Sequence, residues 1–386
     1  MDLSNLEIKD NCVREKLSGL LIFIYLVLFP FYLWESGLPQ IADFILLLFL
    51  IISLFTTKIK KKYKLIWLIS FIFIFYVTLV DLVWSTILST LIIMPTLYFV
   101  YNFLVMLFLV EKINSKPTYY IHIILKGVIS SLFLQFAISM IYVGDRLRAV
   151  LFFNNPNQLG FFVLLMTSLL FILYKIKKIN SNFMIIILLF SSYLMILSVS
   201  QGAIASFAIL ILLFIALERH KQKHKIKLFF LAGVIIFPLF LVFSNPYSLQ
   251  GHLPHLDLLI RRVQTSHDRN EGGLLTGRGY DRIFNHPQYL IFGAGEGEFW
   301  RFDSSIPRSE IHSTLGSLLF SYGIIGFSIF LILLFMIIKK NDVKFSYPLA
   351  PIFIYGLTHN GIRQTLFWIA LALLITVDRN LSNKTR

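Results

Sequence analysis

The sequence predicts an all-α fold: a polytopic membrane protein of about twelve transmembrane helices, with one large outer loop that contains short helices. Hydrophobic residues make up 57% of the 386 residues, mean hydropathy is +0.77, and charged residues make up 14%, where a soluble domain has about 25%. Long apolar runs recur along the whole chain, so the bilayer is the expected solvent. The net charge of +15 fits an excess of Lys and Arg in cytoplasmic loops, and we expect membrane lipid rather than nucleic acid as a partner.

The hydrophobic segments divide the chain into three parts. Membrane helices one to nine fall in residues 1–244, the outer loop in 245–312, and helices ten to twelve with a cytoplasmic tail in 313–386. The first segment lacks a following small-residue cleavage site, so it is expected to be a membrane helix rather than a signal peptide. The seventh, eighth and eleventh segments are short for a crossing helix, so tilted or re-entrant helices are expected there. The approximate bounds are 17–34, 40–57, 65–83, 87–110, 119–143, 157–174, 183–199, 203–217, 228–244, 313–338, 347–358 and 364–378.

Lysine sets the expected orientation. With about twelve spans, all of the lysine clusters fall on one side together with both termini, and that side is expected to be cytoplasmic. The clusters are Lys58, Lys60, Lys61, Lys62 and Lys64; Lys175, Lys177 and Lys178; Lys221, Lys223, Lys225 and Lys227; and Lys339, Lys340 and Lys344.

The opposite side carries arginine and no lysine in its two substantial loops, 144–156 and 245–312. Because guanidinium offers a planar donor fork that binds phosphate bidentately, this set suggests an anionic ligand. Ordinary loop solvation and pairing with Asp and Glu are the alternative. The arginines are Arg146, Arg148, Arg261, Arg262, Arg269, Arg278, Arg282, Arg301 and Arg308, joined by Arg363 from a short loop.

Other charged and reactive groups narrow the function classes. No carboxylate is expected deep inside a span, since Asp43 and Asp81 fall near outer ends, and this counts against a proton-coupled transporter. Cys12 is the only cysteine, so an internal disulfide is impossible. We expect no cofactor and no resident metal, although acids such as Glu296 and Glu298 leave an ion open on sequence alone.

The outer loop has internal order. Apolar residues at helical spacing in 256–263 predict a short amphipathic helix on the membrane surface. Thr276-Gly277-Arg278 is expected to open a second short helix, which Pro287 follows. The turn from Gly293 to Gly297 permits close backbone approach to a ligand, and a phosphate cradle is one interpretation of it.

A histidine ends the outer loop where the tenth segment begins. His312 is expected at the membrane–water boundary, where it can accept a proton near neutral pH as a general base. The alternative is an interfacial histidine bonded to a carbonyl. The other loop histidines are expected to be solvated or structural, namely His252, His255, His267 and His286.

Taken in order, these outer-side motifs resemble the O-antigen ligase and O-antigen polymerase superfamily. The resemblance covers roughly residues 140–335, while the first four spans match only in hydrophobicity. It rests on the joint order of Arg148-Ala-Val-Leu-Phe-Phe-Asn-Asn-Pro156-Asn157, Thr276-Gly277-Arg278, Phe292-Gly-Ala-Gly-Glu-Gly297, Glu310-Ile-His312-Ser and Tyr322-Gly-Ile-Ile-Gly326.

The resemblance implies a membrane glycosyltransferase at the outer face of a bacterial inner membrane. Such enzymes take a glycan from undecaprenyl diphosphate and pass it, with inversion and without an obligatory metal, to an acceptor sugar hydroxyl. Matched residue by residue, Arg148 and Arg278 would bind the diphosphate and His312 would activate the acceptor, which requires that they converge. Supporting roles are implied for their neighbours Arg146, Arg282 and Glu310.

The expected subtype, polymerase or ligase, depends partly on where this sequence departs from the pattern of the superfamily. Leu151 stands where the family often has Gly, and only seven residues, 279–285, separate Arg278 from His286, where the family often has a longer helix. The sequence therefore favours a repeat-unit polymerase, whose further partner would be a chain-length regulator. The alternatives are an O-antigen ligase acting on lipid A core, a lipid-linked oligosaccharide flippase or transporter, and a non-catalytic scaffold.

Overall fold

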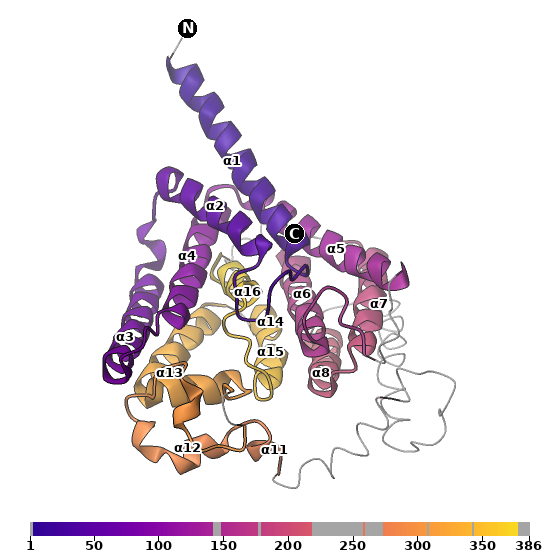
Figure 1. Cartoon of the computed structure of the whole chain (residues 1–386). Helices are drawn as coiled ribbons and strands as arrows, with labels where there is room; N and C mark the ends of the chain where they lie inside the picture. Colours follow the sequence, from indigo (N-terminus) through magenta and orange to yellow (C-terminus); the bar gives the residue numbers. More distant parts are fainter. Residues whose placement is uncertain are drawn as a thin grey trace. The chain divides into compact units, whose positions relative to one another are not determined.

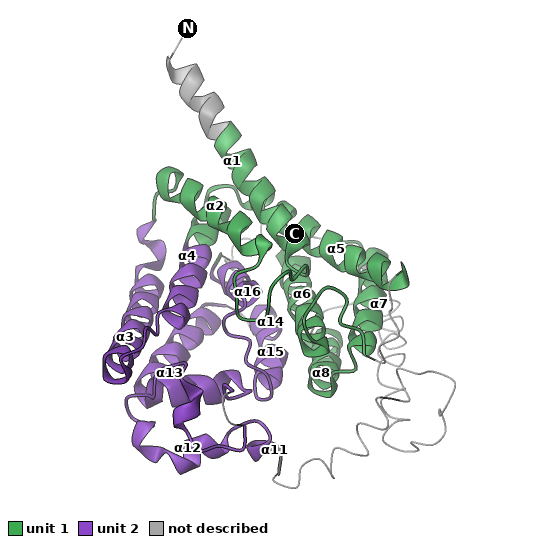
Figure 2. Ribbon diagram, in the orientation of Figure 1, with its two compact units in different colours: residues 1–59, 108–261, 376–386 green, residues 60–107, 262–375 purple. Residues whose placement is uncertain are grey.

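In the computed structural model, the described residues are 3–141, 148–176, 179–217, 258, 273–306, 309–341 and 343–376, and over these the chain is helical with no strand (Figure 1). The chain divides into two compact units, and each is described by itself (Figure 2). Unit 1 comprises residues 1–59, 108–261 and 376–386, and unit 2 comprises 60–107 and 262–375.

Among the described residues, five helices are long and apolar enough to cross a membrane: 61–88, 94–115, 117–141, 156–176 and 314–340. Shorter apolar helices lie over 41–56, 182–198, 201–217 and 365–376. The chain is thus an all-helical protein with several candidate membrane spans among its described residues, and the count of twelve spans stays a prediction. The expected ninth span, 228–244, and the expected amphipathic helix, 256–263, lie almost wholly outside the described residues.

Unit 1 is organised around α6, which is buried along almost its whole length. Because α6 is apolar on every face, it can be covered by helices all round: α5, α7 and α8 pack against it, and α1 packs against α2 and α5. Its helices are α1 (Leu3–Leu28), α2 (Ile41–Thr56), α5 (Pro117–Ile141), α6 (Pro156–Ile176), α7 (Ser181–Ser198) and α8 (Gln201–Leu217).

Unit 2 is organised around a pair of long helices, α3 and α13, which pack along one another. Helix α4 begins in unit 2 and continues into unit 1 from residue 108. The helices are α3 (Lys64–Leu88), α4 (Met94–Ser115), α11 (Gly273–Thr276), α12 (Asp281–Asn285), α13 (Thr314–Lys340), α14 (Val343–Ser346), α15 (Leu349–Tyr355) and α16 (Thr365–Thr376), and short 3₁₀ turns lie at Lys61–Tyr63, Pro287–Tyr289 and Phe299–Arg301.

Helix α13 is broken at Gly323, where φ is 64° and ψ is −177°. In an unbroken helix the Phe320 carbonyl would accept from the N–H of Ile324. Here it accepts from Ala294 N at 2.9 Å, while Ile324 N donates to Leu290 O at 2.7 Å. The outer-loop segment 290–295 therefore fills the break in α13.

The two ends of unit 2 differ in charge type. Lys340 places its Nζ 4.2 Å from the ring centroid of Tyr63, so the end of α13 meets the lysine-rich start of α3. At the other end of α3, Trp84 Nε1 donates to Gly293 O at 3.1 Å. The described part of the outer loop and these lysine clusters thus occupy opposite ends of the α3–α13 pair.

Several expected boundaries differ from the structure. The fourth expected span, 87–110, runs across a non-helical stretch before Met94. The eleventh, 347–358, contains only the seven helical residues of α15, followed by turns. The Thr276-Gly277-Arg278 triplet does not open a helix, because α11 ends at Thr276 and α12 begins at Asp281.

Candidate functional site

Two of the predicted site residues, Arg278 and His312, lie next to each other in unit 2. The backbone N–H of His312 donates to the Arg278 carbonyl at 2.9 Å. Gly279 lets the chain turn after Arg278, since its φ of 78° is rarely adopted by residues with side chains. The Arg278 side chain is partly exposed and has no hydrogen-bond or ion-pair partner among the described residues. Its guanidinium donors are therefore available to a ligand.

His312 has the protonation state that a base requires. The residue is exposed at the surface, but desolvation of its ring by the surrounding protein lowers its pKa. The charges of Arg278 and Arg282 lower this pKa further, whereas Glu310 raises it. The imidazole is thus neutral at neutral pH, with a nitrogen able to accept a proton.

A second imidazole, that of His359, belongs to the same group of residues. Burial, followed by the charges of His312 and Arg278, lowers the pKa of His359 to about 4, so this ring is neutral too. Its ring stacks on Tyr355 at a centroid distance of 5.0 Å. Its carbonyl accepts from both the N–H and the hydroxyl of Thr314, at 3.1 and 3.0 Å. These bonds tie the turn after α15 to the start of α13.

The start of α13 is held from several directions. Ser313 is the N-cap, and its Oγ accepts from Gly316 N at 3.0 Å. The Tyr280 hydroxyl lies 2.6 Å from Ser313 Oγ and 2.8 Å from Leu357 O. Because the loop, the N-cap and the 356–359 turn are bonded together, the backbone that carries His312 is fixed at this point.

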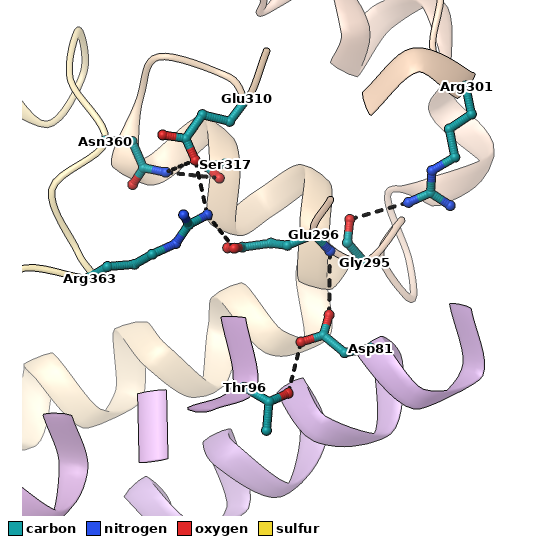
Figure 3. Close-up of polar contacts among 9 residues, drawn as sticks. All are labelled: Asp81, Thr96, Gly295, Glu296, Arg301, Glu310, Ser317, Asn360 and Arg363. Carbon is teal, nitrogen blue, oxygen red and sulfur yellow. Dashed lines mark hydrogen bonds and ion pairs between the residues drawn. The ribbon is translucent and has the colours of Figure 1, made fainter. Parts of the chain in front are cut away.

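A network of charged and polar residues in unit 2 includes Glu310, two residues before His312 (Figure 3). Arg363 Nη2 donates to Glu310 Oε2 at 2.9 Å and also pairs with Glu296. Glu296 is only 2% exposed at its side chain. Asn360 Nδ2 donates to the same Glu310 oxygen at 3.1 Å. Partial burial lowers the pKa of Arg363, but Glu296 and Glu310 raise it by more, so this arginine keeps its charge.

The network continues to helices α3 and α4 (Figure 3). Asp81 Oδ1 accepts from the backbone N–H of Glu296 at 3.4 Å, and its Oδ2 accepts from Thr96 Oγ1 at 2.9 Å. The Asn102 amide donates to Arg363 O at 2.9 Å. The ion pairs of Arg363 are thereby joined to helices α3 and α4 as well as to the loop.

Arg282, expected to support ligand binding, is a structural residue. Its side chain is fully buried, donates to Ser309 O at 2.9 Å, and lies over the rings of Phe299, Phe302 and Phe320. Arg301 is similar, since it lies 4.5 Å from the ring centroid of Trp84 and donates to Ala294 O. Both guanidiniums face aromatic rings and loop carbonyls, so Arg282 holds the loop, and the supporting role in ligand binding expected for it stays a prediction.

The Gly293–Gly297 turn is not a phosphate cradle. The N–H groups of Gly293, Ala294 and Gly295 donate to Tyr289 O, Phe320 O and Ser321 O at 2.8, 2.9 and 2.8 Å. A Cβ on Gly293 would lie 2.3 Å from Ser321 O. The close approach that glycine permits here is therefore made to α13 and not to an anion.

The remaining predicted residues have different locations and contacts. Arg148 belongs to unit 1, where its Nη2 donates to Asn157 Oδ1 at 3.1 Å. Arg146 lies outside the described residues. Glu310 is in the site, but its described contacts are with Arg363 and Asn360. His286 accepts from Asp303 N at 3.1 Å, as expected of a structural histidine.

Sequence reasoning missed the partners of the site rather than its centre. Glu296 and Arg363 were noted as loop charges, but nothing in the sequence pairs residues so far apart. His359 and Asn360 passed unnoticed in a short segment between two apolar runs. The sequence does show that a His-Asn pair, followed closely by Arg363, separates two apolar segments. Polar groups between membrane segments usually have polar partners, and this could have pointed to the site.

No protein-family model matches the chain, and no curated protein matches its sequence.

Proposed function

We propose that this protein is a membrane glycosyltransferase that polymerises glycan repeats carried on undecaprenyl diphosphate at the outer face of a bacterial inner membrane. The proposal is carried by Arg278, whose guanidinium has no partner among the described residues, and by its bonded neighbour His312. The backbone of His312 donates to Arg278 O, and the charge of Arg278 helps to keep the imidazole neutral. An anion site next to a proton acceptor is what transfer from a diphosphate to a hydroxyl requires.

In the proposed reaction, His312 takes the proton from an acceptor sugar hydroxyl. The hydroxyl oxygen then bonds to the anomeric carbon of the donor, from the side opposite the leaving group. The bond between that carbon and the diphosphate oxygen breaks, and undecaprenyl diphosphate leaves with the bonding electrons. Arg278 stabilises the negative charge that develops on this oxygen. Arg148 is retained as a second diphosphate ligand on the strength of the family resemblance.

The outer location is supported by charge. Positive residues accumulate in short cytoplasmic loops. The start of α3 and the end of α13 are rich in lysine, and they lie at the opposite end of this helix pair from Arg278 and His312. We therefore assign the lysine-rich end, and both termini, to the cytoplasm. A lipid diphosphate suits the outer face as a donor because it supplies both membrane anchor and leaving group.

Arg278 provides the principal test. We expect Arg278→Ala to lower polymer formation roughly 10²–10³-fold, corresponding to about 2.7–4 kcal/mol of transition-state stabilisation. Surface polysaccharide is measured on gels from a deletion strain carrying the variant at equal membrane expression. Arg14→Ala, which removes an exposed arginine of α1, is the matched control and leaves chain length unchanged. Wild-type chain lengths with Arg278→Ala would refute the proposal.

Arg148 is tested by a conservative change. Because lysine lacks the bidentate fork, Arg148→Lys is expected to shorten the polymer although the charge is kept. Normal polymer from this variant would remove Arg148 from the proposed site.

The main alternative within the enzyme class is a ligase that transfers finished polymer to lipid A core. The two activities differ in what a deletion strain accumulates. Single lipid-linked repeats support the polymerase, and lipid-linked polymer supports the ligase. Transport of the lipid-linked glycan across liposomes without bond formation would instead establish a flippase.

A further inference from the structure

The segment that fills the break in α13 is unusual for a surface loop. Residues 287–295 contain no charged side chain. Most polar backbone groups of residues 290–295 are bonded to protein, the Ile291 N–H and C=O and the Phe292 N–H being the exceptions among the described residues. Ala294 and Gly295 donate to α13, and Leu290 O accepts from Ile324 N. Phe292 O and Gly293 O accept from the side chains of Tyr76 and Trp84, at 2.9 and 3.1 Å. Non-helical backbone at membrane depth needs protein around it that supplies its hydrogen bonds, and α3 and α13 supply most of them here.

Residues 291–293 pack directly against the backbone of α13, with no side chain between the two. A Cβ on Gly323 would lie 2.2 Å from Ile291 O, and one on Gly293 would lie 2.5 Å from Tyr322 Cα. Residues 291–293 therefore touch the α13 backbone directly, and their depth is the depth of Gly323.

Two helices give that depth independently. At about 1.5 Å per residue, Gly323 is about 24 Å along α13 from Lys339. On α3, the contact residues Tyr76 and Trp84 are about 18 and 30 Å from Lys64. Since the hydrocarbon of a bilayer is about 30 Å thick, a membrane that begins near these lysines includes the filled break in its far half.

The exposed side chains of the segment are apolar. Ile291 and Phe292 are 57% and 67% exposed. The neighbouring surface of α3 is apolar as well, with exposed residues at helical spacing at Phe71, Phe75, Leu79 and Leu82. Tyr76 joins the two surfaces through its bond to Phe292 O. The segment thus continues a face whose only suitable solvent is hydrocarbon.

We propose that residues 289–295 form a re-entrant, membrane-inserted segment whose Ile291 and Phe292 side chains contact lipid acyl chains. This part of the outer loop is then an element of the membrane domain and completes α13, whereas residues 298–306 stay in water. The inference does not depend on the proposed enzymatic activity, because it follows from backbone contacts, depth and exposure alone.

Cysteine accessibility tests the insertion. In a Cys12→Ser background, single cysteines replace Phe292, Leu79 and Asp303, and open membrane fragments react with a membrane-impermeant maleimide. Leu79, 47% exposed, is the lipid-facing control on α3, and exposed Asp303 is the water-facing control in the same loop. We expect Phe292→Cys to react at least about tenfold more slowly than Asp303→Cys, because the reactive thiolate is disfavoured in hydrocarbon.

Two further measurements separate insertion from simple steric protection. Denaturation in SDS is expected to equalise labelling of all three thiols. A fluorophore on Phe292→Cys is expected to be quenched by acyl-chain nitroxide lipids as strongly as one on Leu79→Cys. Labelling of Phe292→Cys as fast as Asp303→Cys, or quenching no stronger than at Asp303→Cys, would overturn the proposal.

Discussion

Glu296 is a buried carboxylate that needs a positively charged partner. Its side chain is 2% exposed, and it pairs with Arg363, which also reaches Glu310. An isolated charge at such a position would be strongly unfavourable. The ion pairs of Arg363 therefore constrain the backbone. They hold the turn at residue 296, the segment before His312 and the start of α16 in one arrangement.

Removing one partner of this pair is expected to cost more than removing both. Arg363→Ala leaves Glu296 buried without its cation, at a cost of about 3–5 kcal/mol. The double change Arg363→Met with Glu296→Leu is expected to restore part of that loss. Thermal unfolding of the purified variants in detergent measures both. A double variant as unstable as the sum of its single variants would contradict the coupling.

His312 gives a pH dependence with a definite sign. Its pKa is below the usual 6.5 because of desolvation and the nearby arginines, and only the neutral imidazole accepts a proton. We therefore expect polymer formation in isolated membranes to fall as pH drops, with a midpoint below 6.5. Glu310 raises this pKa, so Glu310→Gln is expected to move the midpoint lower still.

The control for this profile is His359, whose pKa is about 4. His359→Gln is expected to leave the midpoint essentially in place. A midpoint that follows His359→Gln, or one that Glu310→Gln raises, would exclude His312 as the group that titrates.

At the scale of elements, the break in α13 is what connects the loop to the membrane helices. Gly323 combines a φ of 64° with a ψ of −177°, a conformation essentially confined to glycine. The carbonyls released by the break accept from the loop, and the freed Ile324 N–H returns a bond to Leu290. The helix and the loop segment thus satisfy each other's backbone hydrogen bonds.

Gly323→Ala is expected to destabilise the protein by more than backbone strain alone. Strain accounts for about 1–3 kcal/mol, and the added Cβ would also lie 2.2 Å from Ile291 O. Gly37→Ala is the matched control, because its φ is 96° but no atom lies within 4 Å of a Cβ there. Melting temperatures in detergent compare the two. An equal loss would show that the contact with Ile291 contributes nothing.

At the scale of the whole molecule, the topology is predicted from the lysine clusters and from the absence of lysine in loops 144–156 and 245–312. In a Cys12→Ser background, Lys62→Cys is expected to react with an impermeant maleimide only from the cytoplasmic side, and Asp303→Cys only from outside. Intact cells and inverted vesicles distinguish the two sides. Labelling of both thiols from one side would overturn the orientation and, with it, the outer location of Arg278 and His312.

Much of the site's centre was accessible from sequence. Arg278 and His312 were chosen because they match the arginine and histidine positions of the superfamily that the sequence resembles, and the two do lie together in unit 2. Arg282 was named only as a neighbour of Arg278, and it is buried among aromatic rings. Residue type and side of the membrane do not distinguish an arginine that faces a ligand from one that holds a loop.

The sequence alone determined that this is an all-helical chain with apolar helices suited to a membrane, and that the two long loops expected outside contain arginine but no lysine. Hydropathy and charge are properties of short segments, so they can be read without knowing what packs against them. Only the tertiary structure decided that residues 290–295 fill the break in α13 and that Glu296 meets Arg363. Such pairings join segments far apart in the chain, and they exist only once the helices that carry them have packed.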